Sequence, residues 1–515
     1  MKPEPDLLPA PTRPSGIEQF ARLLLLWLAC TLAALIPWMR STFGDFTIGQ
    51  IVFHWRHLGG SASIDPLTIL DFLVMACALP LIGACLLYWV LYRVAPSPMF
   101  AGPVPAARHR AIRRAGWVVP VLVIAGCLAL LAARTSTVQF LTPFGKVDYF
   151  ADHYVPPGSV KLVPGQRKNL VLIYVESLEA AYRREDLFGR NLLAGLDALQ
   201  PVSFDSFEQM PGTGWTIAAM VATQCGIPLK PVGILQPHDQ GELISAFLPG
   251  AVCLGDILHE QGYKNVFLGG AALEFSGKGK FLVGHQYHEV YGRDEWLSAG
   301  TPRARISGWG LHDDDLFINA KSKLRELHGA GQPFNLTLLT VDTHWPSGFV
   351  SEGCKQRGAT KMDDLVACAA DQVADLVQFI RSSGMGADTS VVVVGDHLSP
   401  PNELAAQLDS VPRRTIYNGF FAQPAPTPNR SEVVHFDLLP TILDLIGLHP
   451  QGGRMGLGYS AFGPSAAPVM TAASRDALVK NVLAPSRAYT RLWEPKPKPQ
   501  SSPAPAPGDR NGAQP

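Results

Sequence analysis

The stretch NLVLIYVESLE, residues 169–179, decides the fold class of this chain. An apolar run without polar alternation ends here at a glutamate, Glu176. The same pattern recurs in FNLTLLTVDTH (334–344) and in TSVVVVGDH (389–397). Continuous apolar runs are typical of strands that are covered on both faces, and segments of helical period such as 363–384 lie between them. We therefore expect an α/β domain with a mainly parallel sheet between helices.

Polar side chains that can bind a metal follow each of these three strands. They are Glu176 after the first, Asp342, Thr343 and His344 after the second, and Asp396 and His397 after the third. Ligands of open α/β sheets bind outside the carboxyl ends of the strands, so these residues point to one shared site. Each residue taken alone reads equally well as a solvated loop residue or a helix cap. Glu, Asp, His and hydroxyl ligands suit Mn²⁺, Mg²⁺ or Zn²⁺, and Gly395 is expected to allow a turn in the backbone.

A hydroxyl for this site lies in PGTGWTIAAMVATQCGIPL, residues 211–229, where a turn leads into a short helix. We expect Thr216 at the N-cap of that helix and Thr223 buried within it. A threonine cap can be purely structural. The amino end of a helix also attracts phosphate, and a bound metal makes a hydroxyl more acidic. Thr216 is the preferred nucleophile on this pattern, and Thr213 in the preceding turn is its competitor.

Three apolar segments before residue 135 are expected to span a membrane, because a bilayer core requires roughly 20 apolar residues. They are residues 23–38, 71–92 and 115–133. The first also reads as a signal peptide, but two spans follow it, so we favour an anchor. Five arginines and no acidic residue lie in 93–114, which places this loop and the N-terminus in the cytoplasm and everything after residue 133 outside.

The chain therefore divides into an anchor, a linker, a catalytic domain and a C-terminal extension. The expected boundaries are 1–134, 135–165, 166–465 and 466–515, and the extension ends in a Pro-rich tail that we expect to be disordered. The 43 basic residues balance the 43 acidic ones, which argues against a nucleic-acid partner.

Four of the eight cysteines lie in the outer domain, where an oxidising compartment favours two disulfides. Three pairings are possible. We expect Cys225–Cys253 and Cys354–Cys368, because each closes a short loop. The other four cysteines lie in the apolar segments and read as packing residues.

Six segments, taken in order, give the chain a family resemblance. They are YVESLE, PGTGWTIAAMVATQCGIPL, CLGDILHEQGY, WGLHDDDLF, VDTHWPSGF and GDHL. Their order resembles the phosphoglycerol transferases of the alkaline phosphatase superfamily, which modify osmoregulated periplasmic glucans, and more distantly the lipoteichoic acid synthases. The likeness covers roughly residues 165–450 and implies an alkaline phosphatase/sulfatase-like domain, preceded by an α-helical transmembrane region.

The resemblance assigns roles to individual residues. It implies that one divalent ion, with Mn²⁺ the first choice, is held by Glu176, Thr216, Asp396 and His397. Thr216 becomes the phosphorylated nucleophile, and His344 serves the substrate phosphate or the leaving group. Trp309 and the acids of HDDD (312–315) are expected to lie near the site. Trp309, Lys278 and Lys280 are candidates for contacts with the substrate, although both lysines also read as solvated loop residues. His435 is expected to be mainly structural, with a substrate or second-metal role as the alternative.

The implied activity is transfer of phosphoglycerol from phosphatidylglycerol to a periplasmic glucan, by an enzyme of the bacterial inner membrane with its catalytic domain in the periplasm. Alternatives are phosphoethanolamine transfer to lipid A or glycans, and a metal-dependent phosphodiesterase. A non-catalytic receptor built on a degenerate enzyme domain is disfavoured by the complete set of site residues. A sulfatase would require C-x-P-x-R, whereas CGIPLK (225–230) carries its proline one position later and has no arginine.

Overall fold

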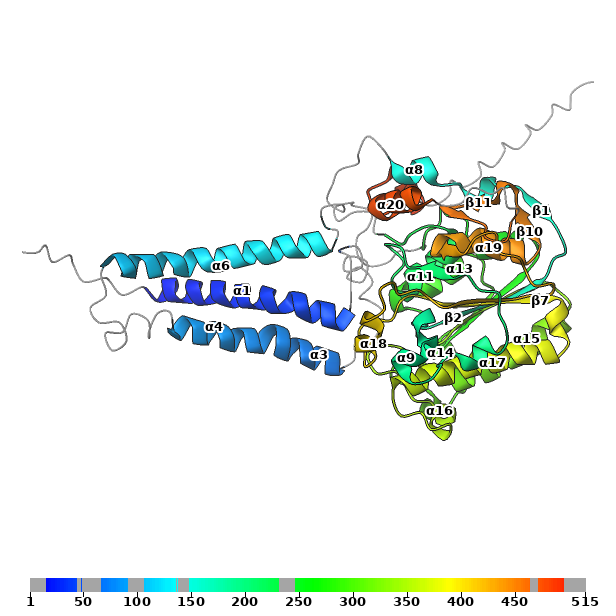
Figure 1. The fold of residues 1–515 in the computed structure, drawn as a ribbon, viewed down its shortest axis with the longest axis horizontal. Coiled ribbons are helices and arrows are strands. Elements are labelled where there is room, and N and C mark those ends of the chain that lie inside the picture. Colours follow the sequence, from blue (N-terminus) through cyan, green and yellow to red (C-terminus); the bar gives the residue numbers. More distant parts are fainter. Residues whose placement is uncertain are drawn as a thin grey trace, which may run out of the picture.

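The computed structural model describes most of the chain. The described residues are 15–43, 48, 66–90, 106–135, 137, 148–230, 246–463 and 471–494. Three long helices extend from one side of an α/β domain (Figure 1). The Pro-rich tail expected at the C-terminus and Arg93 of the orientation-setting loop lie outside the described residues.

The three extended helices are long and apolar enough to cross a membrane. Their spanning portions are Gly16–Thr42, Ile69–Trp89 and Arg114–Arg134. They belong to α1 (Gly16–Phe43), to α3 (Pro66–Phe72) continued by a π-helical turn (Leu73–Ala78) and α4 (Leu79–Trp89), and to α6 (Ala106–Arg134). The first helix extends beyond the apolar run at both ends, so it reaches the length of a span even though that run is short.

Polar contacts join the spanning helices to one another. The Trp38 indole nitrogen of α1 donates a hydrogen bond to Asp71 Oδ2 of α3 at 2.7 Å. The Arg22 guanidinium of α1 lies 5.5 Å from the ring centre of Trp117 in α6. Many large apolar side chains of these helices are exposed, including Leu86 and Leu122. The three helices therefore form a unit with an apolar outer surface, as lipid contact requires.

The domain is built on a six-stranded sheet with the order β5-β4-β6-β2-β7-β8. All neighbouring strands are parallel except β7 and β8. In that order their bounds are Glu289–Tyr291, Lys264–Gly269, Phe334–Leu339, Asn169–Val175, Thr389–Gly395 and Asn418–Phe421. Val175 and Gly395 are partners in the register of β2 and β7, so the residues that follow these two strands leave the sheet side by side.

Both faces of β2 are buried, which is why its sequence is continuously apolar. Leu170, Leu172 and Tyr174 belong to one core, and the residues between them belong to the other. Helices cover the two faces (Figure 1). One face carries α11 (Thr216–Cys225), α12 (Leu254–Glu260), α13 (Lys278–Gly284) and α19 (Leu438–Leu445), and the opposite face carries α15 (Asp313–Gly329) and α17 (Met362–Ser382).

Short elements complete the domain around the sheet. Strands β3 (Ser206–Glu208) and β9 (Glu432–Val434) form a parallel pair, and β11 (Arg454–Met455) and β12 (Gly458–Tyr459) an antiparallel pair. The remaining short helices are α9 (Glu185–Phe188), α10 (Ala194–Asp197), α14 (Arg293–Ser298), α16 (Glu352–Gln356) and α18 (Ala405–Asp409).

Segments from the expected linker and C-terminal extension pack on the domain. In the former, α8 spans Tyr149–His153, and β1 (Leu162–Pro164) pairs with β10 (Leu448–Pro450). The extension forms α20 (Ala472–Asn481) and α21 (Arg487–Arg491). Lys230 Nζ donates hydrogen bonds to the carbonyl oxygens of Val482 and Ala484, at 3.0 and 2.6 Å. The folded unit therefore reaches at least to residue 494.

The two disulfides are the pairs expected from the sequence. Cys225, the last residue of α11, is bonded to Cys253, which immediately precedes α12. Cys354 of α16 is bonded to Cys368 of α17. The cysteines of the apolar helices are free, at positions 30, 77, 85 and 127.

Candidate active site

Three potential metal ligands gather where β2 and β7 end. The side chains of Glu176, Asp396 and His397 are buried, and one ligand atom from each lies within 4.8 Å of the others. His397 Nε2 lies 3.5 Å from Glu176 Oε1 and 3.3 Å from Asp396 Oδ2. The register of β2 and β7 explains this meeting, because it places the first residues after the two strands next to each other.

The charges of this cluster fit a cation. Asp396 Oδ2 is buried and accepts no hydrogen bond, whereas Oδ1 accepts from the backbone N–H groups of Ser177 and His397 at 2.8 and 2.9 Å. Burial and then the charge of Glu176 raise the pKa of Asp396 to about 6. Two buried carboxylates with an open oxygen between them repel each other unless a positive charge intervenes, and a divalent cation supplies it.

His397 presents a ligand nitrogen to the same point. Its Nδ1 lies 2.9 Å from the carbonyl oxygen of Leu398, so Nδ1 carries the hydrogen and donates it. Nε2 is left to face the two carboxylates. A backbone acceptor on one ring nitrogen commonly fixes the tautomer of a metal-binding histidine, and Glu, Asp and His together suit Mn²⁺, Mg²⁺ or Zn²⁺.

Neighbouring hydroxyls hold Glu176 in place. Ser177 Oγ donates to Glu176 Oε1 at 2.7 Å, and Thr343 Oγ1 donates to the Glu176 carbonyl oxygen, also at 2.7 Å. The Glu176 N–H donates to Thr340 Oγ1 at 3.0 Å. Ser177 adopts a left-handed backbone conformation, with φ of 55°, which is strained for a residue with a side chain. Ser177 and Thr340 were not predicted as site residues, and their place at strand ends is the only signal in the sequence that could have found them.

Gly395 is required for the space that it leaves. Gly395 does not adopt the left-handed backbone conformation, in which φ is positive. A Cβ at this position would lie 2.1 Å from the carbonyl oxygen of Leu178. The chain does bend directly after this residue, at Asp396 and His397, and the missing side chain of Gly395 lets the loop after β2 pass directly against the end of β7.

Thr216 joins the cluster from the start of α11. Its Oγ1 donates a hydrogen bond to Glu176 Oε2 at 3.4 Å. Trp215, in an extended conformation, is the N-cap, and Thr216 is the first helical residue. The expected N-cap position of Thr216 is thus wrong by one residue. Its hydroxyl is directed to Glu176 and does not cap the helix, while the first i→i−4 bond of the helix runs from Ala219 to Trp215.

The other threonines of this stretch are engaged elsewhere. Thr213 is fully buried, and its Oγ1 both donates to the Met210 carbonyl oxygen at 2.7 Å and accepts from the Met210 N–H at 3.1 Å. Thr223 lies within the helix, as expected, and donates to the Ala219 carbonyl oxygen at 2.8 Å. Thr216 is therefore the hydroxyl of this stretch that faces the metal ligands.

His344 and Trp309 form a stacked pair beside the cluster. Their ring centres are 4.0 Å apart and the planes meet at 27°. His344 Nδ1 donates to the Trp345 carbonyl oxygen at 2.7 Å. Burial lowers the pKa of His344 to about 4, and the charges of His397, Asp396 and Lys278 also act on it. The ring is therefore neutral at pH 7, with Nε2 available to accept a proton.

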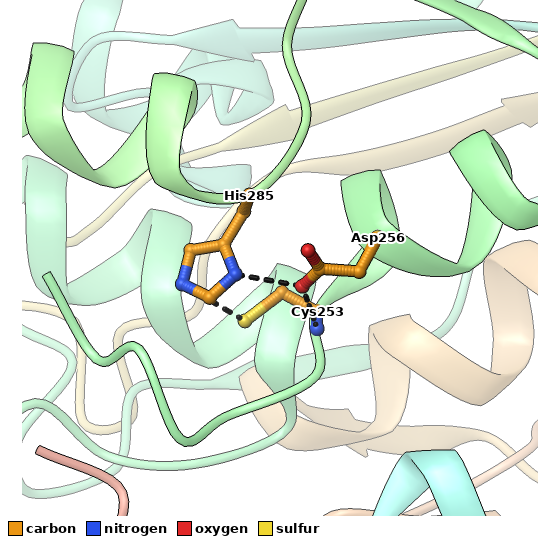
Figure 2. A group of neighbouring side chains, drawn as sticks. All are labelled: Cys253, Asp256 and His285. Carbon is orange, nitrogen blue, oxygen red and sulfur yellow. Dashed lines mark hydrogen bonds and ion pairs between the residues drawn. The ribbon is translucent and has the colours of Figure 1, made fainter. Parts of the chain in front are cut away.

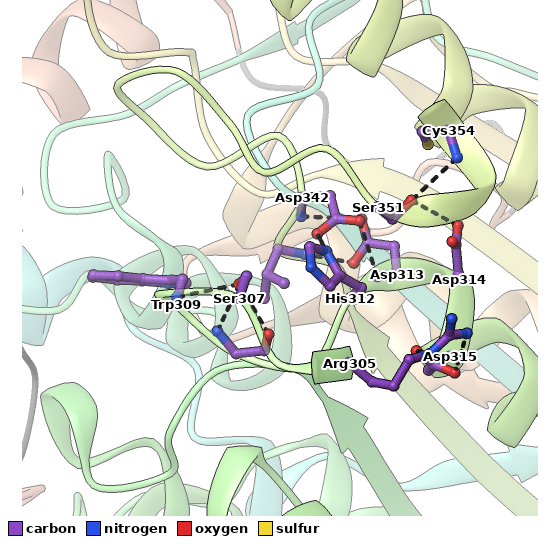
Figure 3. Close-up of polar contacts among 12 residues, drawn as sticks. Arg305, Ser307, Trp309, His312, Asp313, Asp314, Asp315, Asp342, Ser351 and Cys354 are labelled. Carbon is purple, nitrogen blue, oxygen red and sulfur yellow. Dashed lines mark hydrogen bonds and ion pairs between the residues drawn. The ribbon is translucent and has the colours of Figure 1, made fainter. Parts of the chain in front are cut away.

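Asp342 does not join the metal ligands. His312 Nδ1 and the Asp313 N–H donate to its two carboxylate oxygens at 2.8 and 3.1 Å (Figure 3). The Asp313 carboxylate in turn accepts from the Val341 and Asp342 N–H groups. Burial raises the pKa of both carboxyls. This pair thus fixes the start of α15 against the end of β6 and contributes no ligand.

The other two acids of HDDD are bonded to residues outside the cluster. Asp314 accepts from Ser351 Oγ at 2.8 Å and from the Gly353 N–H at 2.6 Å. Asp315 forms a two-pronged ion pair with Arg305, at 2.7 and 2.8 Å (Figure 3). The acids expected near the site therefore serve the packing of α15 and α16.

The two candidate lysines lie in different surroundings. Lys278, at the start of α13, is buried, and burial lowers its pKa to about 8 although the charges of Glu176 and Asp396 oppose this. Its ammonium group is thus within electrostatic reach of the ligand cluster. Lys280 is exposed, because two residues in a helix correspond to about 200° of rotation.

His435 is buried and supports the cluster from behind. Its Nε2 donates to the Asp396 carbonyl oxygen at 2.8 Å. Burial lowers the pKa of His435 to about 4. These contacts fit the structural role expected for this residue, because they fix the backbone of a metal ligand.

The low pKa of His344 predicts a loss of stability in acid. The unfolded chain binds the His344 proton near pH 6.5, whereas the folded chain binds it only near pH 4. Unfolding is thus favoured as the pH falls through this window. We expect His344→Asn to reduce the acid-induced loss of unfolding free energy by on the order of 2 kcal/mol. Denaturant titrations of the detergent-solubilised chain at pH 7 and pH 4.5 test this, and an equal loss in both proteins would contradict it.

This sheet, with candidate metal ligands at the carboxyl ends of its strands, defines an alkaline phosphatase-like α/β domain. The family model described as Sulfatase matches residues 168–448, more than half of the chain, and the chain belongs to this family. Membership does not make it a sulfatase, because Cys225 of the CGIPLK segment is bonded to Cys253.

The chain is also similar to named relatives. It is 38% identical over 344 residues to phosphoglycerol transferase I of Xanthomonas campestris pv. campestris (strain B100), covering 64% of this chain and 48% of that protein. The enzyme of the same name from Salmonella arizonae is 36% identical over 341 residues, covering 64% and 43%. The chain thus spans about half the length, or less, of these relatives. A solved structure of lipoteichoic acid synthase LtaP from Listeria monocytogenes is 17% identical and covers 70% of this chain and 97% of that one, with a TM-score of 0.44.

Proposed function

We propose that this chain transfers phosphoglycerol from phosphatidylglycerol to a periplasmic glucan, through a covalent intermediate on Thr216. The observation that carries the proposal is the hydrogen bond from the Thr216 hydroxyl, at the start of α11, to the buried carboxylate Glu176. The relatives named phosphoglycerol transferase I supply the substrate class. Glu176, Thr216, Asp396 and His397 would hold one divalent ion, with Mn²⁺ our first choice.

In the first half-reaction, Thr216 Oγ1 forms a bond to the phosphorus of phosphatidylglycerol and diacylglycerol leaves. A divalent cation bound by the cluster would lower the pKa of the attacking hydroxyl and offset the charge on the phosphate. Glu176 accepts the hydrogen bond of that hydroxyl, orients the oxygen and takes its proton as the bond to phosphorus forms. An anionic phosphodiester beside His344 favours the protonated form of its ring, so Nε2 can then donate a proton to the leaving diacylglycerol oxygen.

In the second half-reaction, a glucan hydroxyl attacks the phosphorus and takes the phosphoglycerol, and the released Thr216 oxygen recovers its proton from Glu176. His344 is neutral again at this stage and accepts the proton of the attacking hydroxyl at Nε2. The first i→i−4 bond of α11 is made by the Ala219 N–H. The N–H groups of the helix that come before Ala219 face the transferred phosphate. Free amides at a helix start favour an anion there by roughly 0.3–1 kcal/mol, and up to about 2 kcal/mol when partly buried.

The same proposal places the chain in a bacterial inner membrane, with the N-terminus in the cytoplasm and the domain in the periplasm. Three helices of spanning length precede the domain, and two disulfides lie within it, as suits an oxidising compartment. A membrane anchor keeps the site within reach of a lipid donor, and the soluble glucan would approach from the periplasm.

The buried Lys278 is proposed to bind the donor phosphate, which predicts different effects for the two lysines of α13. We expect Lys278→Met to raise KM for phosphatidylglycerol about tenfold, because a charge-assisted contact is lost. Lys280→Met is the matched control and should change KM by less than about twofold, since Lys280 is exposed. Initial rates in mixed micelles measure both, and equal effects of the two changes would contradict the assignment.

Release of labelled diacylglycerol tests the proposed function. The purified full chain is incubated with Mn²⁺, purified glucans and either phosphatidylglycerol or phosphatidylethanolamine, each labelled in both its acyl chains and its headgroup. We expect diacylglycerol from phosphatidylglycerol together with label on the glucan. Exclusive use of phosphatidylethanolamine would establish the phosphoethanolamine alternative, and release of free glycerol phosphate without labelled glucan would establish a phosphodiesterase.

A further inference from the structure

A second cluster of reactive side chains lies around the Cys225–Cys253 disulfide. His285 Nδ1 donates to Asp256 Oδ2 at 2.7 Å, and His285 Nε2 lies 3.7 Å from Cys253 Sγ (Figure 2). Asp256 Oδ2 also accepts from the Cys253 N–H at 2.8 Å. The cysteine comes from the residue before α12, the carboxylate from the first turn of α12, and the histidine from the residue after α13.

The cluster has the ligand spacing of a metal site but lacks a free thiolate. One ligand atom from each of Cys253, Asp256 and His285 lies within 4.8 Å of the others. The sulfur is bonded to Cys225, however, and a disulfide sulfur is a poor metal ligand. What remains is a carboxylate that orients an imidazole toward a disulfide sulfur, which is an arrangement suited to stabilising a departing thiolate.

We propose that Cys225–Cys253 is a redox-active disulfide, in which His285, oriented by Asp256, stabilises Cys253 as the leaving thiolate. Asp256 fixes the ring so that its other nitrogen faces Cys253 Sγ. An imidazole that carries both protons then directs an N–H at this sulfur. A leaving thiolate that is stabilised departs faster in thiol–disulfide exchange.

The reaction requires a dithiol reductant. One thiolate of the dithiol attacks Cys225 Sγ, so a mixed disulfide forms while the Cys225–Cys253 bond breaks and its electron pair goes to Cys253. His285 gives its Nε2 proton to this thiolate or pairs with it. The second thiolate of the dithiol then attacks the reductant's own sulfur and releases Cys225, which takes a proton from water. The protein disulfide is reduced, and the dithiol is oxidised to a cyclic disulfide.

The position of the bond links this chemistry to the helix of the nucleophile. Cys225 is the last residue of α11 and Thr216 is the first. Reduction thus frees the far end of the helix from α12. The redox proposal itself does not depend on the transferase activity, because the exchange is measured on the sulfurs alone.

The chain contains a matched control disulfide. Cys354 and Cys368 are buried to a similar degree as Cys225 and Cys253, with exposed fractions of 2% and 4% against 1% and 0%. The polar side chain at Cys354 Sγ is the neutral amide of Gln372, whose Nε2 lies 3.6 Å away. Because the two disulfides are similarly buried, a difference between their reduction rates reflects the side chains beside the sulfurs more than the burial of the sulfurs.

The test is the rate of reduction of each bond in the folded full chain in detergent. The chain is treated with dithiothreitol, quenched by alkylation, and both cysteine pairs are quantified by peptide mass spectrometry. We expect Cys225–Cys253 to be reduced at least about tenfold faster than Cys354–Cys368. His285→Gln should slow the first bond about tenfold and leave the second unchanged, with a smaller effect from Asp256→Asn.

Equal reduction rates of the two disulfides in the wild-type chain would overturn the proposal. It would also be overturned if His285→Gln left the ratio of the two reduction rates unchanged. If His285→Gln instead increases the reduction rate of both disulfides, the substitution has disturbed the packing of the domain. The Asp256→Asn variant then provides the test. This variant keeps an oxygen to accept from the Cys253 N–H, so an unchanged ratio of the two rates in it also rejects the proposal.

Discussion

Thr216→Ala is expected to lower phosphoglycerol transfer at least about 10³-fold, because it removes the atom that forms the covalent intermediate. Thr216 is the hydroxyl of the 211–229 stretch that contacts Glu176, one of the proposed metal ligands. Glu176, Asp396 and His397 remain in the variant, so it should still bind Mn²⁺. Diacylglycerol release and metal binding, measured on the same preparation, separate loss of the nucleophile from loss of the ion.

Thr213→Val is the control for this experiment. Thr213 is buried and bonded to the backbone of Met210, so its replacement should cost stability and leave the rate per folded molecule within about threefold. Thr216→Ser keeps a hydroxyl and should retain part of the activity. An active Thr216→Ala enzyme together with an inactive Thr213→Val enzyme would reverse the assignment.

Asp396→Asn is expected to change stability in opposite directions with and without metal. Without metal, the Asp396 carboxyl has a pKa of about 6, raised from 3.8. The folded chain thus holds this proton more tightly than the unfolded chain, so stability is lost as the pH rises from 3.8 to about 6 and this cost is fully present at pH 7. The neutral amide removes that cost, so at pH 7 the metal-free variant should be more stable by on the order of 2 kcal/mol.

With Mn²⁺ present the order reverses. An ion that binds only the folded chain adds about 2.7 kcal/mol at a concentration of 100 times Kd, and the variant loses most of this gain. Melting temperatures of the detergent-solubilised chain, with chelator and then with Mn²⁺, give both signs in one series. An equal Mn²⁺-induced rise in Tm for the variant and the wild type would place the ion elsewhere.

The sequence predicted the sheet and the meeting of its strand ends because both follow from short, strongly constrained patterns. Strands buried on both faces are continuously apolar, as β2 and β7 are, and parallel strands end at one edge. Glu176, Asp396 and His397 each follow a strand directly, so their place needed no knowledge of the loops. The disulfide pairs were predictable because each closes a short loop.

What the sequence did not reveal depends on contacts between distant segments. Asp342 also follows a strand, but His312 and Asp313 from the start of α15 engage its carboxylate. Lys278 and Lys280 look alike in sequence and differ only through the rotation of α13. Helices α20 and α21 are short and polar, and distant residues attach them to the domain: the ammonium of Lys230 bonds the chain after α20, Arg475 pairs with Glu208 and Glu432, and the ring of Tyr489 is buried.

The most direct test of the central claim is to trap the intermediate. The full chain is incubated with phosphatidylglycerol and Mn²⁺ but without acceptor, and the peptide that contains residues 211–229 is analysed by tandem mass spectrometry. We predict one phosphoglycerol group, located on Thr216 and absent from the Thr216→Ala protein. An adduct on Thr213, or turnover of phosphatidylglycerol with no adduct on this peptide under any quench condition, would contradict the account.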